Sequence, residues 1–96
     1  MRVSFRPEAA ADIADARLWY EDRRPGLGAA FEEAVAAAIT FVRDTPQAFP
    51  VVHRDVRRVL LHRFPYALYY RIEDNKIRVI ACLHMRRHPG TWKGRG

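Results

Sequence analysis

The run VRRVLLHRF at residues 56–64 decides the fold, together with the two runs that follow it, YALYYRIE at 66–73 and KIRVIACLHMRR at 76–87. In each run, β-branched and aromatic residues alternate with other residue types, and Pro65 and the Asp74-Asn75 pair separate the runs. Period-two patterns with turn residues between them predict three antiparallel strands.

The predicted strands have two different faces. Alternation places Val59 and Leu61 on one face of the first run, opposite Arg58, Leu60 and His62. In the last run it separates two sets, which are Ile77, Val79, Ala81, Leu83 and Met85, and Arg78, Ile80, Cys82, His84 and Arg86. The outward face of the sheet would then carry a row of arginine and histidine side chains, which suits the binding of phosphate or carboxylate groups.

The first half of the chain predicts a short strand and two helices. Val3 and Phe5 alternate with polar residues, and Pro7 then opens a helix over about residues 7–23. The Pro25-Gly26 pair ends that helix, and a second one follows over about residues 27–43. The expected buried stripes are Ala9, Ile13, Ala16 and Tyr20 in the first helix, and Leu27, Phe31, Ala34, Val35, Ala38 and Val42 in the second.

These elements predict an α+β fold in the order β-α-α-β-β-β. We expect the helix hairpin to pack on one face of a small antiparallel sheet, with the first strand at the edge of that sheet. Residues 1–96 would form a single domain, with residues 93–96 as a frayed tail. The single cysteine, Cys82, cannot form an internal disulfide, and no apolar run approaches the roughly 20 residues that span a bilayer. We therefore expect a soluble, cytoplasmic protein without a signal peptide or a membrane partner.

Charge is divided unevenly between the two halves of the chain. Residues 1–50 hold six arginines and eight acidic residues, a net charge of −2. Residues 51–96 hold nine arginines and two lysines against three acidic residues, a net charge of +8, and all four histidines. A basic half on a small protein indicates a polyanionic partner, either a nucleic acid or an acidic protein segment, although a merely solvated basic face is the simpler reading.

Several residues of the basic half are candidates for a functional site. Arginines on alternating strand positions would bind phosphate groups or a target surface, and the candidates are Arg57, Arg58, Arg63, Arg71, Arg86 and Arg87, together with Trp92. His62 and His84 would serve as general base and general acid if the protein cleaves RNA, or else they are two separate surface histidines. Tyr66, Tyr69, Tyr70 and Trp92 either stack on bases or are ordinary strand residues.

No cofactor or metal site is predicted. Cys82, His84 and His88 lack the spacing of a zinc motif, and a cysteine within an apolar strand is common as plain core. Glycine-rich phosphate loops, nucleophile elbows and paired carboxylates are missing from the sequence as well.

The chain resembles the RelE/ParE toxins of bacterial type II toxin–antitoxin systems. The resemblance rests on FRPEAAADIADARLWYED at residues 5–22, on the run from Arg57 to Trp92, and above all on the closing HMRRHPGTW, which is similar to the end of plasmid-stabilisation toxins. The family resemblance implies the β-α-α-β-β-β fold, a cognate antitoxin as partner in a hetero-oligomer, and one of two activities. RelE-like members cut mRNA on the ribosome, and ParE-like members inhibit DNA gyrase.

Departures from the ribonuclease pattern favour the ParE-like branch. Anchored at Tyr66, that pattern places Arg58 and Leu60 at two lysine positions, Ala67 at an arginine, Arg86 at the strand-end arginine and Trp92 at a tyrosine near the C-terminus. Only two of these five positions keep a cation, and cations would activate the 2′-hydroxyl and offset phosphate charge. The resemblance therefore implies a toxin that stops growth by inhibiting DNA gyrase. The alternatives are a ribosome-dependent mRNA endonuclease that uses Arg58, Arg86, His62 or His84, and a non-toxic module that binds nucleic acid or protein.

Overall fold

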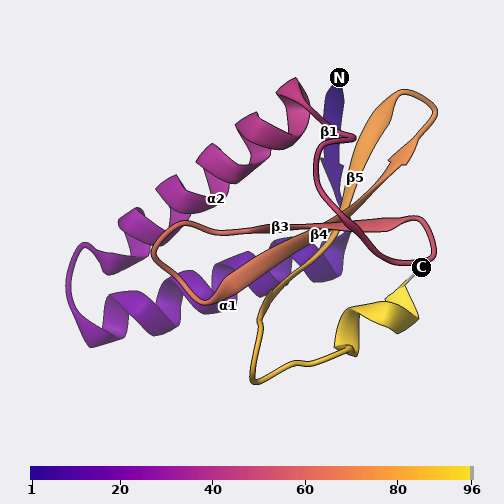
Figure 1. Cartoon of the computed structure of the whole chain (residues 1–96). Coiled ribbons are helices and arrows are strands. Elements are labelled where there is room, and N and C mark those ends of the chain that lie inside the picture. The colour runs from indigo at the N-terminus through magenta and orange to yellow at the C-terminus, as the bar shows by residue number, and fades with distance from the viewer. Residues whose placement is uncertain (96) are drawn as a thin grey trace.

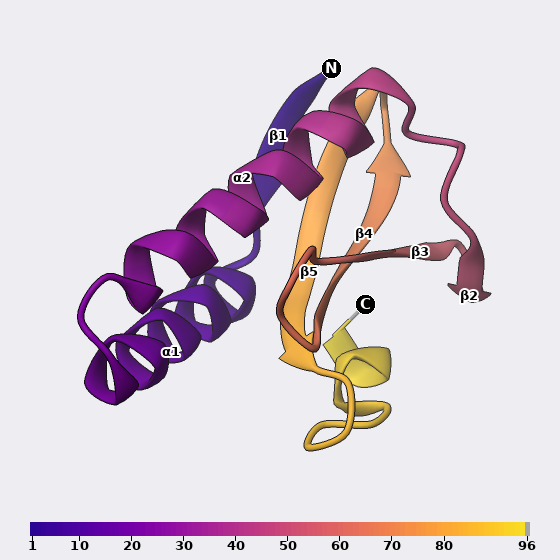
Figure 2. The ribbon, with the colours of Figure 1, turned by 60° about the vertical axis from the view of Figure 1, so that its left-hand side comes forward.

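The computed structural model describes residues 1–95, and Figure 1 shows the arrangement of its elements. In chain order these are β1 (Arg2–Phe5), α1 (Pro7–Arg23), α2 (Leu27–Asp44), β2 (Val51–His53), β3 (Val56–Leu60), β4 (Tyr66–Glu73), β5 (Lys76–His84) and the 3₁₀ helix η1 (Thr91–Arg95). Figure 2 shows α1 and α2 on one side of the sheet and η1 on the other. The predicted α+β fold is confirmed, with one strand more than expected. Within residues 1–95 no helix combines the length and the apolarity needed to cross a membrane.

The helix hairpin follows the sequence closely. Pro7 occupies the start of α1, where its missing N–H costs nothing. Gly26 joins the helices with a positive φ of 95°, a conformation that glycine adopts without steric cost. The Glu21 carboxylate accepts hydrogen bonds from the backbone N–H groups of Gly26 and Gly28, at 3.1 and 2.9 Å, and thereby caps the start of α2. A Cβ at Gly28 would lie 3.0 Å from the Arg17 carbonyl oxygen, so the glycine permits the close approach of the helices.

The sheet is mixed rather than wholly antiparallel. Its strand order is β1-β5-β4-β3-β2, so the predicted edge position of the first strand is confirmed. β1 runs parallel to β5, with Val3 opposite Ile77, whereas the other neighbours are antiparallel. β2 was not predicted as a strand, because its three residues are too few to show a period. It pairs with β3 at the opposite edge.

The predicted faces of β5 are correct as far as Ile80 and wrong from Ala81 onward. The pairing of β4 with β5 shifts between Tyr69 and Tyr70, which face Ala81 and Val79. Ile80 is therefore an extra residue, a β-bulge that turns the rest of β5 by one position. As a result Cys82 joins Ile77 and Val79 in the core under the helices, and Ile80, Ala81 and Leu83 lie on the other face.

The core under the helices contains most of the predicted apolar residues. Phe31 is fully buried there and packs against the rings of Tyr20, Phe64 and Tyr66. The expected stripes are confirmed except at Leu27, which is only half-buried. Ala9, Ala16, Phe31, Val35, Ala38 and Val42 are buried, and Ile13, Tyr20 and Ala34 are partly buried against the same core. The face of the sheet away from the helices, called the open face below, differs from the prediction of an arginine and histidine row. It carries a second apolar cluster, which comprises Val56, Ala67, Tyr69, Ile80, Ala81, Leu83 and Trp92.

Three predicted boundaries also differ. β3 ends at Leu60 instead of residue 64, because the chain turns at Arg63, whose φ is 74°, and the Leu61 N–H then bonds to the Tyr66 carbonyl. β5 ends at His84 instead of residue 87, where a turn begins. Residues 93–95 are not frayed, because η1 contains them and Arg95 forms an ion pair. Residue 96 of the predicted tail lies outside the described residues.

Candidate functional site

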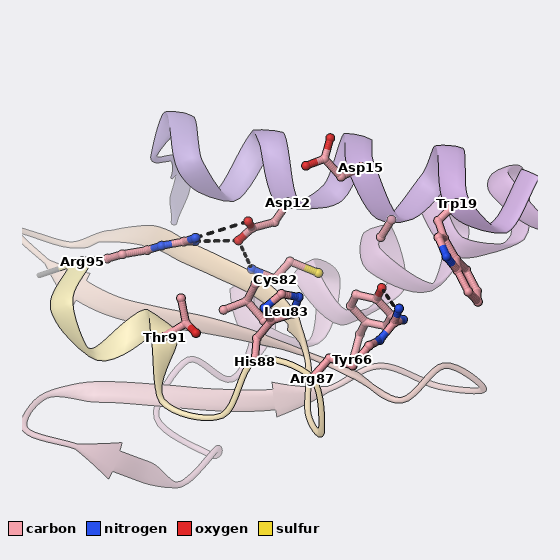
Figure 3. Close-up of a pocket in the computed structure, with 11 residues that line it drawn as sticks. Asp12, Asp15, Trp19, Tyr66, Cys82, Leu83, Arg87, His88, Thr91 and Arg95 are labelled. Atoms are coloured by element: carbon pink, nitrogen blue, oxygen red, sulfur yellow. Dashed lines mark hydrogen bonds and ion pairs between the residues drawn. The ribbon is translucent and has the colours of Figure 1, made fainter.

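A groove of about 360 Å³ lies where α1, the end of β5 and the C-terminal segment meet. Figure 3 shows its lining side chains. α1 contributes Asp12, Asp15 and Trp19, the sheet contributes Tyr66 and Leu83, and the C-terminal segment contributes Arg87, His88, Thr91 and Arg95. The groove thus joins carboxylates at one end with an aromatic and cationic group at the other.

Two side chains of the groove cap the free edge of β5. β1 pairs with β5 only as far as Val79, so the backbone beyond it has no strand neighbour on that side. The Cys82 N–H donates to Asp12 Oδ2 at 3.0 Å, and the Ile80 carbonyl accepts from Arg95 Nη1 at 3.2 Å. Asp12 and Arg95 also pair with each other, with Nη1 2.6 Å from Oδ2. Side chains here satisfy backbone groups that a sixth strand would otherwise pair.

The other end of the groove is built around Trp19. Its ring lies 4.0 Å from the guanidinium carbon of Arg23 and 5.0 Å from that of Arg87, distances typical of cation–π contacts. Arg87 Nη2 also donates to the Tyr66 hydroxyl at 3.4 Å. Burial raises the pKa of Tyr66, and the positive charge of Arg87 partly opposes the rise. Arg87 is exposed on its other side, so it is held in place and still faces solvent.

The thiol in the groove is not a nucleophile. Burial, followed by the nearby charge of Asp12, raises the pKa of Cys82 to about 12. A thiol with that pKa is almost wholly protonated at neutral pH and unreactive. Within residues 1–95 no group of three or more histidine, cysteine or acidic side chains is placed to hold a metal ion.

His84 organises the turn after β5. Its Nδ1 accepts the backbone N–H groups of Arg86 and Arg87, at 3.1 and 3.2 Å, and its ring packs edge-on against Tyr66. Burial lowers the pKa of His84, and the charges of Arg87, His88 and Arg86 lower it further. His62 lies exposed in the turn after β3, and among the described residues no hydrogen bond or ring contact joins it to His84. The structure therefore does not assemble the two imidazoles as an acid–base pair.

Arg57 and Arg63 come from β3 and from the turn that follows it. Arg57 lies on the helix side of β3. It donates hydrogen bonds to the backbone carbonyls of Phe49 and Gln47, at 2.7 and 3.1 Å, and these bonds hold the loop before β2 in place. Arg63 is exposed in the next turn, 5.8 Å from the ring of Phe64. The expected single basic cleft is therefore divided into separate clusters.

Arg58 and Arg71 lie on the open face instead. Arg58 stands opposite Tyr69 in the pairing of β3 with β4. Arg71 pairs with Asp55, Nη2 to Oδ1, at 3.2 Å. Arg86 is exposed beside Arg87 in the turn after β5, which we call the basic turn (residues 85–88).

Trp92 is buried rather than presented to a target. It is 5% exposed and stacks on Tyr69, with ring centroids 4.4 Å apart and planes at 18°. The ring of His53 packs edge-on against it at 5.7 Å. Trp92 therefore closes the apolar cluster of the open face as a lid, and the assignment of Trp92 as an exposed contact residue is corrected.

Sequence reasoning missed Asp12, Trp19 and Arg95. Asp12 and Arg95 are 83 positions apart, and no local pattern links such residues. Trp19 had a signal, because a tryptophan outside the buried stripe of a helix indicates a contact of its own. Tyr66 and Arg87 were both named as candidate site residues. Their hydrogen bond was not predicted, because it depends on the turn after β5.

Comparison with known families identifies the family of this chain. A model of the ParE toxin of the type II toxin–antitoxin system parDE matches residues 3–89. The chain belongs to the ParE toxin family. The match ends before η1, so Trp92 and Arg95 lie outside it. Among curated proteins, none is similar enough to this ParE-family chain to count as a relative.

A solved structure has the same fold. The chromosomal ParDE toxin–antitoxin system from P. aeruginosa superposes with a TM-score of 0.66 at 20% sequence identity, and the alignment covers 88% of this chain and 95% of that one. In the present ParE-family chain, two positions that the RelE ribonuclease pattern assigns to cations face each other across β3 and β4. They are Leu60, which is 56% exposed, and Ala67, which is fully buried. The apolar pair thus occupies the part of the open face where that pattern has charge.

Proposed function

We propose that this chain is the toxin of a type II toxin–antitoxin pair, that it stops growth by inhibiting DNA gyrase in the cytoplasm, and that a cognate antitoxin neutralises it in a hetero-oligomer. Membership of the ParE toxin family carries the proposal. As a protein inhibitor it needs no chemistry of its own and no cofactor. Such a pair would stabilise a plasmid or another element that encodes it.

The open face supports gyrase inhibition over mRNA cleavage. Leu60 and Ala67 offer no proton acceptor and no charge for a phosphate, whereas cleavage of RNA needs both at the scissile bond. Arg58 and Arg86 keep the two remaining cations of the pattern, on β3 and in the basic turn. The endonuclease stays the alternative, with Arg58 and Arg86 as its charged groups and His62 or His84 as its base.

We assign the contact with the target to the basic turn. Arg86 and Arg87 are exposed, and His84 holds the backbone of both residues. A cation whose position is fixed loses little side-chain entropy on binding, which favours its use in an interface. An Arg86→Ala/Arg87→Ala double variant should lose growth inhibition. Its melting temperature should fall only slightly, because Arg87 gives up a 3.4 Å hydrogen bond and a cation–π contact at the surface.

The antitoxin would bind through charge as well as shape. The +8 charge of residues 51–96 favours an acidic segment that folds onto the toxin. Its association rate should fall steeply between low and high salt, because screening weakens electrostatic steering. An association rate that does not depend on salt would contradict this part of the proposal.

Induction of the toxin without antitoxin tests the activity. Labelled thymidine and labelled amino acid are followed in parallel, and purified toxin is added to a gyrase supercoiling assay. We expect DNA synthesis to stop first and supercoiling to be inhibited. An immediate stop in translation with cleaved mRNA would favour the endonuclease, and unchanged growth would favour the non-toxic binding module. The Arg86→Ala/Arg87→Ala variant is the control that links the outcome to the basic turn.

A further inference from the structure

Two arginines face each other on the open face, away from the basic turn. Arg71 of β4 and Arg78 of β5 are direct partners in the antiparallel pairing. Their sequence neighbours Tyr70, Ile77 and Val79 pack in the core under the helices, so both arginines point to the open face. Directly opposed residues have Cβ atoms about 4.5–5.5 Å apart, and like charges in that position destabilise a sheet.

The protein neutralises this pair only in part. Arg71 Nη2 lies 3.2 Å from Asp55 Oδ1, and the Asp55 side chain is 61% exposed. Arg78 Nη1 donates to the uncharged Ser4 hydroxyl at 3.2 Å. Arg71 Nε is buried and finds no acceptor within residues 1–95. Of the two guanidinium groups, only that of Arg71 has a carboxylate partner among the described residues, and solvent screens that carboxylate.

The surroundings add further positive charge. Arg58 faces Tyr69, two residues before Arg71 in β4, which puts Arg58 in the diagonal position that long side chains can bridge. The Arg58 side chain makes no hydrogen bond or ion pair with another described residue. Glu73 lies two residues after Arg71 in β4 and faces Lys76 in the pairing with β5, so these two opposite charges offset each other in the charge count. The cluster of Arg58, Arg71 and Arg78 keeps a net positive charge after Asp55 is counted.

We propose that Arg71 and Arg78, with Arg58 beside them, bind a phosphate group. A guanidinium presents a planar fork of donors, and two forks held side by side match a tetrahedral anion with several oxygens better than they match a carboxylate with two. Bound phosphate would also remove the repulsion across the strand pair. The phosphate belongs either to a free phosphate compound or to a nucleic-acid backbone. The proposal is independent of the toxin's target, because the site lies away from the basic turn.

Melting of the purified full chain tests the site. The melting temperature is measured in sodium chloride, sodium acetate, sodium phosphate and sodium pyrophosphate at one pH and one ionic strength. We expect phosphate and pyrophosphate to raise it above the value in chloride, because an anion that binds only the folded state stabilises that state. An equal rise in acetate would overturn the proposal.

Two variants locate the effect. Arg78→Gln should lose the rise in phosphate and should melt no lower than the natural protein in chloride, because the substitution removes the like-charge contact. Arg43→Gln replaces an exposed arginine of α2 and should keep the full rise. A rise in Arg78→Gln equal to that of the natural protein would overturn the proposal. If Arg78→Gln fails to fold, Arg78→Lys replaces it, since it keeps the charge and loses the fork.

Titration calorimetry identifies the source of the phosphate. Pyrophosphate and a short single-stranded oligonucleotide are titrated into the natural protein and into the Arg78 variant. We expect the variant to bind at least one of these probes about tenfold more weakly, as the loss of one charge-assisted contact predicts. A preference for pyrophosphate assigns the site to free phosphate compounds, and a preference for the oligonucleotide assigns it to a backbone. Equal binding of both probes by natural protein and variant would overturn the assignment.

Discussion

Arg95, the last described residue, pairs with Asp12 of α1, and its Nη1 lies 2.6 Å from Oδ2 across 83 positions of the chain. The two side chains are only 18% and 13% exposed, so the pair is screened far less than a surface salt bridge. Each residue also satisfies a backbone group of β5. The pair therefore joins η1, α1 and the edge of β5 in one arrangement.

Removal of either partner of this pair should destabilise the protein. Asp12→Ala also leaves the N–H of the buried Cys82 without its acceptor, so we expect it to cost about 2–4 kcal/mol of unfolding free energy, and Arg95→Ala somewhat less. Urea denaturation of both variants and of the double variant gives the coupling energy between the residues. Additive effects would show that the pair does not act as a unit.

The two phenylalanines of α2 provide a matched test of the core. Phe31→Ala should cost about 3–5 kcal/mol, because it opens a cavity among Tyr20, Phe64 and Tyr66. Phe41 lies on the same helix and is 61% exposed, so Phe41→Ala should change the unfolding free energy by about 0.5 kcal/mol or less. Chemical denaturation measures both values, and equal losses would show that the assigned face of α2 is wrong.

The two tryptophans allow a similar comparison between the open face, which holds Trp92, and the groove, which holds Trp19. Trp92→Ala should cost about 3–5 kcal/mol because the indole stacks on Tyr69 inside an apolar cluster. Trp19→Ala should cost about 1 kcal/mol, since it removes cation–π contacts from a partly exposed ring. Fluorescence of the Trp19→Ala variant reports Trp92 alone and should be blue-shifted. Emission at the wavelength of solvent-exposed tryptophan would contradict the lid.

His84 makes stability depend on pH in a defined direction. The pKa of His84 is lowered in the folded protein from its ordinary value of 6.5. The contribution of His84 is therefore fully present above that ordinary value and is lost as the pH falls through the folded pKa, because the unfolded state then binds the proton better. Protonation also removes the Nδ1 lone pair that accepts from Arg86 and Arg87.

His84→Asn separates this effect from other titrations. The asparagine oxygen can accept the same backbone N–H groups but does not titrate near neutral pH. Denaturation curves between about pH 5 and pH 8 should therefore show a steeper loss of stability on acidification in the natural protein than in the variant. Parallel pH profiles for the two proteins would exclude His84 as the source.

The helix hairpin could be predicted because residues close together in the sequence determine its boundaries and faces. Pro7, Pro25 and Gly26 set its boundaries, and apolar stripes set its faces. The register of β5 had no such signal. Ile80 and Ala81 are neighbours that fit either face equally well, and only the pairing with β4 decides that both point to the open face.

The sequence marked Arg86 and Arg87 as candidate binding residues but placed them in a strand, and the positions of the other arginines also depend on the fold. Arg57 and Arg58 are adjacent in sequence and lie on opposite faces of β3, one bonded to a loop and the other on the open face. Trp92 was named as a candidate contact residue, and the stacking on Tyr69 that makes it a lid joins residues from different elements. Contacts between distant elements can be identified only once the folded structure is known.

The parallel pairing of β1 with β5, with Arg2 opposite Lys76, determines when the protein can fold during its synthesis. At about 5–20 residues per second, a ribosome makes β5 several seconds after β1. Until then β1 has no neighbouring strand in the sheet, and α1 lacks the strand on which it packs. A chain that stops before β5 leaves both β1 and β4 with unpaired edges. The complete sheet of this ParE-family fold can therefore form only after β5 has been synthesised.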